Sequence, residues 1–361
     1  MTRDKAGYLK GMYRHYGFRH PGVLAAIGAA LLFGCSTPFA KLLLSGISPW
    51  LLAGLLYLGS GLGLALYRLI TRAPAGRLSP GEWPWLAGAI VSGGILAPVL
   101  LMFGLTSSAA SEASLLLNAE GIFTVLLAWY AFHEHFDRYI VLGMIAIIAG
   151  AIVLSWPGEP RISGIWPVAA ILGACLFWGM DNNLTRKVSM SDATWIASIK
   201  GLASGSVNLV LAFITGASLP PFPHLAGALI VGWLAYGVSL TLFVIGLRHL
   251  GTARTGAYFS VAPFFGAVLS IPLLGEPVSL RLLLAGAFMG LGVWLHLSEH
   301  HIHPHTHESI EHEHEHVHEK EHQHSHENSE SSEKNHSHTH RHEPVTHVHA
   351  HYPDTDHRHK H

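Results

Sequence analysis

The stretch Ser108–Glu134, SAASEASLLLNAEGIFTVLLAWYAFHE, decides the fold, because its pattern occurs twice in the chain. The second copy is Thr252–Glu276, TARTGAYFSVAPFFGAVLSIPLLGE, and a shift of 142 residues places Phe123 on Phe265. Both copies begin with small residues, stay apolar for about twenty residues and close on a glutamate, which is long enough to cross a bilayer core of ~30 Å. The sequence therefore predicts a membrane protein with a duplicated bundle of helices.

Composition supports a helical membrane protein. Half of the 361 residues are apolar and 12% are charged, which is typical of this class. Apolar segments of spanning length run over 21–44, 48–70, 84–106, 108–131, 138–156, 163–187, 192–215, 224–247, 252–274 and 279–297. They are continuously apolar rather than alternating, so barrel strands are not expected. We expect an all-α integral membrane protein with ten transmembrane helices.

The duplication extends beyond the opening stretch, since a shift of 145 residues places Gly34 on Gly179 and Trp50 on Trp195. Five helices per copy is an odd number, so the second copy enters the membrane from the opposite side, as in the inverted repeats of transporters. We expect a basic, aromatic N-terminal segment over 1–20, repeats over 21–156 and 163–297, and a tail over 298–361.

Lysine and arginine in the loops predict the orientation. With the N-terminus inside, thirteen of these residues lie on inner loops, and Arg161 and Arg281 lie on outer ones. The positive-inside rule then predicts a multi-pass protein of the cytoplasmic membrane with both termini in the cytoplasm. The N-terminus lacks a small-residue cleavage site and does not read as a removed signal peptide.

Two short motifs carry a family resemblance. LLGEP at Leu273–Pro277 closes the ninth segment, and its weaker partner FHEHF lies at Phe132–Phe136. Together with the two five-helix repeats, they resemble EamA-type permeases of the drug/metabolite transporter superfamily over residues 21–298. The resemblance implies transport of a small solute by alternating access and leaves the solute open. Glu120-Gly121 stands where such repeats often carry proline.

Ionisable residues inside the membrane are functional candidates by default, because an unpaired charge there costs several kcal/mol. Glu120 lies about twelve residues into its segment, near mid-membrane. Desolvation favours a neutral, protonated carboxyl, as proton coupling or cation binding needs. The alternative is a protonated glutamate that hydrogen-bonds to a neighbouring helix.

Asp181 and Lys200 are expected to form an ion pair. The sixth and seventh segments meet in a tight turn near Met190, so residues whose numbers sum to about 381 face each other at equal depth. The pair either joins adjacent helices structurally or gates the substrate, and both readings remain open.

Pro38 and the run Asp181–Asn183 lie at matching places in the first and sixth segments. We expect both helices to be broken there, which in transporters marks the binding site. The alternative for Pro38 is an ordinary helix kink. Asn182 is therefore a transport candidate, and the further candidates for a polar lining are Ser36, Thr37, Asn118 and Tyr258. Each of these four also has a structural reading, because such side chains often tie membrane helices together.

Residues near helix ends are expected to act structurally. Lys41 is expected to extend to the outer membrane surface. Glu134 and Glu276 end matching segments and are expected to cap helices rather than bind a ligand. Gly201 and Gly205, four residues apart, indicate close helix packing.

The tail is acidic and rich in histidine. It holds 22 of the 29 histidines and 13 of the 23 acidic residues, and with so few apolar residues it is expected to be disordered without metal. Imidazoles at alternate positions, with glutamates beside them, suit nickel, zinc, cobalt or copper. The candidate ligands are His301, His303, His305, His307, His312, His314, His316, His318, His322, His324, His326, His336, His338, His340 and His342.

The leading interpretation is a secondary transporter that exports a small metabolite or cation, coupled to protons. One alternative is an efflux permease for divalent nickel, cobalt or zinc with the tail as collector or sensor. Another is a membrane-anchored metal store or sensor. The expected partners are the lipid bilayer, the solute and divalent metal ions, with no required cofactor and no nucleic acid, and the oligomeric state stays open. The chain carries no nucleophile elbow, phosphate loop or closed metal motif, so an enzyme is not expected.

Overall fold

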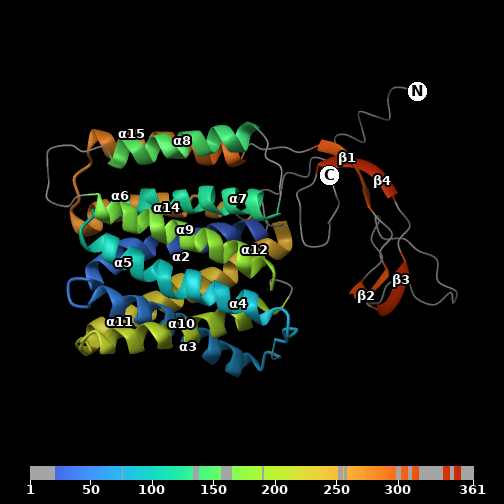
Figure 1. The fold of residues 1–361 in the computed structure, drawn as a ribbon, viewed down its shortest axis with the longest axis horizontal. Helices are drawn as coiled ribbons and strands as arrows, with labels where there is room; N and C mark the ends of the chain where they lie inside the picture. Colours follow the sequence, from blue (N-terminus) through green and yellow to red (C-terminus); the bar gives the residue numbers. More distant parts are fainter. Residues whose placement is uncertain are drawn as a thin grey trace. The chain divides into compact units, whose positions relative to one another are not determined.

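A computed structural model of the protein describes residues 21–74, 76–132, 138–155, 165–188, 191–250, 255 and 258–297, together with four strands near the C-terminus (Figure 1). The chain divides into two compact units, Met1–Glu299 and His300–His361. The first holds the helices and the second holds the strands. The expected N-terminal segment 1–20 lies outside the described residues.

The helices follow the predicted apolar segments. In the first half they are α2 (Pro21–Leu43), α3 (Pro49–Thr71), α4 (Trp83–Ala89), the π-helix η1 (Ile90–Leu96), α5 (Ala97–Thr106), α6 (Ala110–Leu116), α7 (Ala119–Phe132) and α8 (Arg138–Ser155). In the second half they are α9 (Trp166–Arg186), α10 (Ala193–Ile214), α11 (Phe222–Gly232), the π-helix η2 (Trp233–Val238), α12 (Ser239–Leu250), α14 (Ala262–Leu274) and α15 (Leu280–Leu297).

Six helical stretches of the described part are long and apolar enough to cross a membrane. They are Pro21–Leu43, Pro49–Thr71, Trp83–Thr106, Ala110–Leu127, Ala193–Ile214 and Phe222–Gly246. The structure therefore confirms a multi-pass helical membrane protein, and the count of ten spans stays a prediction.

Helices of the two halves pack on one another. α3 packs on α10 and α8 on α15, and Figure 1 shows each pair running side by side. α2 packs on α12 and α14, whereas α9, its counterpart in the second half, packs on α5 and α7. Glycine permits a close crossing of α3 and α10, because a Cβ atom on Gly201 would lie 2.5 Å from the backbone nitrogen of Gly61. This contact confirms the close packing expected at Gly201.

The predicted helix breaks were wrong in position. Pro38 lies inside the continuous helix α2, and Asp181–Asn183 lies inside the continuous helix α9. The Gly34 carbonyl, four residues before the proline, faces α14, where a Cβ atom on Gly266 would lie 2.6 Å from its oxygen. Pro38 has no N–H group to bond the Gly34 carbonyl, and close packing by α14 supports this turn of α2 instead.

The observed break is in the fourth apolar segment. α6 ends at Leu116 and α7 begins at Ala119, with Leu117 and Asn118 in a turn between them. In the ninth segment a turn at Ser260–Val261 precedes α14. The two breaks are 143 residues apart, so they fall at corresponding places in the two halves.

Both π-helices interrupt the third helix of their half. η1 begins at Ile90 and η2 at Trp233, again 143 residues apart. A π-helix widens the turn and often accompanies a functional site. Sequence periodicity gave no sign of either one.

The tail unit contains four strands, β1 (Ile302–His307), β2 (Glu311–His316), β3 (His336–Arg341) and β4 (Val345–Ala350). β1 pairs with β4 and β2 with β3, both antiparallel. Histidine alternates in these segments with a period of two, which matches a strand. Disorder of the tail in the absence of metal stays a prediction.

Candidate functional site

Glu120 lies in the first turn of α7, directly after the break in the fourth segment. The side-chain amide of Asn182, on α9, donates a hydrogen bond to Glu120 Oε1 at 2.9 Å. The same amide donates to the Thr124 hydroxyl at 3.2 Å. The N-terminus of a helix favours a negative charge, so α7 itself supports the carboxylate. The structure thus brings together two candidates from different halves, Glu120 and Asn182.

The expected ion pair between Asp181 and Lys200 is confirmed. Lys200 Nζ lies 2.5 Å from Asp181 Oδ1, and both residues are 8% exposed. The Thr185 hydroxyl donates to the same carboxylate oxygen at 2.8 Å. The pair joins α9 to α10 and neutralises two charges inside the bundle.

The π-helix η1 borders this ion pair. A Cβ atom on Gly93 would lie 1.9 Å from Asp181 Oδ2, so only glycine leaves room for the carboxylate. The Gly93 carbonyl accepts hydrogen bonds from the Tyr57 hydroxyl at 2.5 Å and from Trp178 Nε1 at 3.0 Å. Sequence reasoning missed these three residues, and the Gly93-Gly94 pair was the one available signal.

An aromatic cluster lies beside these polar groups. The ring of Tyr57 lies 5.3 Å from that of Tyr236, on η2. Phe33, on α2, contacts Tyr236 at 5.7 Å and Trp178 at 6.2 Å between ring centroids. The cluster therefore joins helices of both halves, and Tyr57 and Trp178 connect it to Gly93, which borders Asp181.

The remaining candidates of the polar lining are dispersed. Asn118 is buried in the break, where its side-chain amide donates to the Leu115 carbonyl at 2.9 Å. Ser36 and Thr37 are buried in α2. Tyr258 packs with the apolar cluster of Val23 and Ala26. In the described part of the chain, no hydrogen bond connects Thr37 or Tyr258 to Glu120.

The Lys41 side chain, from α2, holds the connection between α5 and α6. Lys41 Nζ donates to the carbonyls of Leu105 and Ser108 at 2.5 and 2.9 Å. The expectation that Lys41 extends to the membrane surface stays a prediction, and the structure places its ammonium group at the carbonyls that close α5. The carbonyls that end a helix lack partners within it and carry partial negative charge, so they attract the ammonium group.

Glu276 confirms the expectation of a helix cap. Its two carboxylate oxygens accept hydrogen bonds from the backbone N–H groups of Ala110, at 2.6 Å, and Ser111, at 2.9 Å. The helix that it caps is α6, which belongs to the other half of the chain. The matching residue Glu134 lies outside the described residues.

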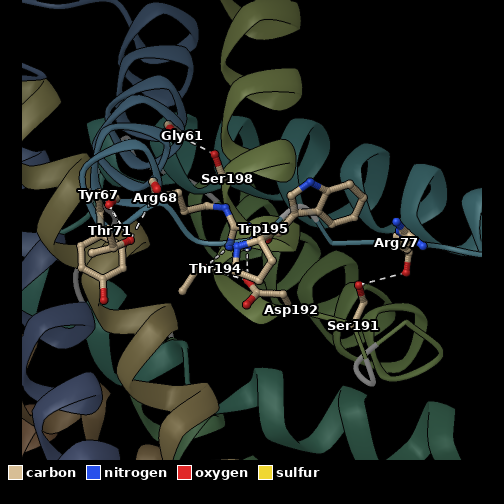
Figure 2. Close-up of polar contacts among 11 residues, drawn as sticks. Gly61, Tyr67, Arg68, Thr71, Arg77, Ser191, Asp192, Thr194, Trp195 and Ser198 are labelled. Carbon is tan, nitrogen blue, oxygen red and sulfur yellow. Dashed lines mark hydrogen bonds and ion pairs between the residues drawn. The ribbon is translucent and has the colours of Figure 1, made fainter.

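A third polar contact fixes the ends of α3 and α10 (Figure 2). The Arg68 guanidinium donates to Asp192 Oδ1 at 2.5 Å and also to the Thr194 hydroxyl and the Pro74 carbonyl. Asp192 caps α10 by accepting from the Trp195 N–H at 2.8 Å. Burial raises the pKa of Asp192, but the hydrogen bonds and the Arg68 charge outweigh it and hold that pKa below its usual range.

Potential metal ligands are dispersed in the part of the bundle that the structure describes. No group of three or more histidine, cysteine, aspartate or glutamate side chains suited to a metal ion occurs among the described residues. Of the expected tail ligands, nine lie on strands: His303, His305, His307, His312, His314, His316, His336, His338 and His340. The others, His301, His318, His322, His324, His326 and His342, lie outside the described residues.

Comparisons with known proteins agree with a membrane transporter. A family model described as the EamA-like transporter family matches residues 20–156 and again 165–298. An uncharacterized transporter of Methanothermobacter thermautotrophicus is 29% identical over 294 residues, which cover 76% of this chain and 85% of the relative. The uncharacterized inner membrane transporter YedA of Escherichia coli is 25% identical over 250 residues, covering 65% of this chain and 78% of YedA.

A solved crystal structure is similar to this chain with a TM-score of 0.61 and 17% sequence identity. The match covers 76% of this chain and 94% of the other. At this identity the likeness shows the fold alone.

Proposed function

The chain belongs to the EamA-like transporter family, and from this premise we propose that it exports a small metabolite or cation by alternating access, coupled to protons. Family membership makes it a membrane transporter rather than an enzyme. We propose that Glu120 is the carboxylate that binds the proton or the cationic solute.

The observation that carries this proposal is the contact between Glu120 and Asn182 at the helix break. The partner of the carboxylate is a neutral amide, so binding a proton or a cation is what neutralises its charge. Glu120 is partly exposed and Asn182 is exposed, which leaves the pair accessible to a solute. A charged carboxylate inside the membrane is unfavourable unless it is neutralised or wetted. Proton coupling uses the resulting difference in free energy between the charged and the neutral carboxyl group.

Alternating access is supported by the relation between the two halves. We propose that they form inverted repeats over 21–156 and 163–297, each with five spanning helices. The family model matches each half once, the π-helices and the helix breaks are repeated at a spacing of 143 residues, and packing partners exchange between α2 and α9. Two related halves around a central site can rock between an inward-open and an outward-open form.

We further propose that the protein resides in the cytoplasmic membrane with both termini inside. Its support is the surplus of lysine and arginine on the inner loops and the likeness to an inner membrane transporter of Escherichia coli.

A divalent metal ion is the second candidate solute, and the strand register of the tail favours it. His312 is paired with His340 and His314 with His338 across the β2–β3 ladder. Paired histidines on neighbouring strands suit nickel, cobalt, zinc or copper. If the protein exports metal, the tail collects or senses the ion. In the alternative hypothesis the bundle only anchors the tail, and the tail stores the metal. Deleting residues 299–361 separates these hypotheses, because a transporter keeps some flux and a store loses its function.

The experiment is proton release in everted membrane vesicles that contain the full-length protein. Candidate metabolites or the chlorides of nickel, cobalt and zinc are added to energised vesicles, and collapse of the pH gradient is followed with a fluorescent amine. We expect at least one solute to collapse the gradient with the intact protein and none to do so with Glu120→Gln.

The matched control is Glu82→Gln, because the Glu82 carboxylate accepts from the Ser79 N–H at 2.7 Å in a loop. This variant should behave as the intact protein does. Equal gradient collapse by the intact protein and Glu120→Gln would contradict the role of Glu120. Solute export without gradient collapse would contradict proton coupling.

A further inference from the structure

Helix α10 carries a stripe of three buried polar side chains. Lys200, Ser204 and Asn208 are four residues apart, so they share one face of the helix and extend over ~12 Å along its axis. They are 8%, 0% and 0% exposed. Burying polar groups in a membrane helix is unfavourable unless each finds a partner.

The stripe is not part of the duplicated pattern. The shift of 145 residues that relates the two halves places Leu55, Gly59 and Gly63 of α3 at these positions. The fold that the halves share therefore does not require a polar face here. The polar face is therefore a feature of α10 that α3 does not share.

Two oxygen atoms of the stripe are left without a partner. Asn208 uses its side-chain N–H group to donate to the Gly94 carbonyl at 3.0 Å. Within the described part of the chain, Ser204 Oγ and Asn208 Oδ1 are buried and have no hydrogen-bond partner. An unsatisfied buried polar atom is destabilising, and a buried water molecule with two or more such partners removes that penalty.

The backbone opposite the stripe is shaped to admit polar atoms. A Cβ atom on Gly94 would lie 1.8 Å from Ser204 Oγ, so glycine lets the hydroxyl approach the π-helix η1. The neighbouring residue Gly93 accommodates Asp181 Oδ2 in the same way. The carboxylate of the ion pair and the Ser204 hydroxyl thus lie against consecutive residues of η1.

We propose that Ser204 and Asn208 hold buried water between α10 and η1, and that this water extends the Asp181–Lys200 pair into a proton route through the middle of the bundle. The titratable groups that border the route are Tyr57 on α3, Asp181 on α9 and Lys200 on α10. The η1 segment, Ile90–Leu96, contributes none. The route deepens the proposed proton coupling, but the water site does not depend on it.

X-ray radiolysis of the purified full-length protein tests the water site directly, because ionised water labels the side chains next to it. Tyr57 and Trp178 are buried, and both donate to the Gly93 carbonyl. Tyr57 also lies beside Gly94, the residue that Ser204 contacts. We expect both to be labelled in the intact protein and labelling to fall several-fold in the double variant Ser204→Ala/Asn208→Leu. Equal labelling in the two proteins overturns the proposal. Neither result depends on transport or on Glu120.

A stability measurement covers the case in which the double variant does not fold. If the site is dry, Ser204→Ala removes an unsatisfied hydroxyl and raises the unfolding temperature. If the site holds water, the same change lowers it. Ser239→Ala is the matched control with a satisfied hydroxyl, since Ser239 donates to the Ala29 carbonyl at 2.8 Å. A rise for Ser204→Ala beside a fall for Ser239→Ala overturns the proposal.

Discussion

Breaking the buried ion pair between Asp181 and Lys200 should destabilise the bundle strongly. Their charged atoms are 2.5 Å apart, and two unit charges at that distance attract by ~7 kcal/mol at an effective dielectric constant of about 20. Desolvation of both ions opposes that attraction by several kcal/mol. Removing one partner leaves the other charge buried and unpaired, so we expect Asp181→Asn and Lys200→Met each to destabilise the fold by ~3–5 kcal/mol.

Unfolding of the purified protein in detergent measures this loss. Each single variant should unfold ~10 °C below the intact protein. The double variant Asp181→Asn/Lys200→Met combines the same two changes and leaves no unpaired charge, so it should be more stable than either single variant. Thr185→Val is the matched control, because it keeps both charges and removes only the hydroxyl that donates to Asp181 at 2.8 Å and accepts from Lys200 at 3.1 Å. It should lower stability by ~1–3 kcal/mol.

The result that would refute this reasoning is additivity. If the double variant loses the sum of the two single losses, the two charges do not depend on each other. The pair would then be a coincidence of packing.

Three further predictions concern the remaining contacts. Glu276→Gln weakens two charge-assisted hydrogen bonds to α6, so it should lower stability by ~1–3 kcal/mol in the same unfolding assay, and no loss would rule out the cap. Because the pKa of Asp192 is held below its usual range, its contribution is fully present above the unfolded pKa, near ~4, and is lost as the pH falls through the lower folded pKa. Asp192→Asn should therefore flatten the stability profile below about pH 4, and an unchanged acid slope would count against this assignment. Gly93→Ala places a methyl group 1.9 Å from Asp181 Oδ2 and should sharply lower the yield of folded protein, whereas Gly121→Ala, with nothing within 4 Å of the added atom, should not, and equal yields would contradict the clash.

Sequence reasoning succeeded where regular helix geometry decides the answer. The duplicated apolar segments predicted a multi-pass bundle, and equal depth in a hairpin was enough to pair Asp181 with Lys200. Both inferences need only the rise per residue and a tight turn.

Sequence reasoning failed where contacts with a distant segment determine the local structure. Pro38 does not break α2, because α14 packs closely against that turn. Lys41 binds the end of α5, a contact that its own segment does not indicate. The π-helix η1 also went unseen, since its carbonyls are held by donors from α3, α9 and α10. Contacts of this kind depend on tertiary packing, which periodicity along one segment does not contain.

The cap that Glu276 places on α6 makes the two halves depend on each other for folding. The first half alone would lack the carboxylate that accepts from the Ala110 and Ser111 N–H groups, together with the helices that pack on α3 and α8. We therefore expect that neither half, expressed alone, folds as an independent domain.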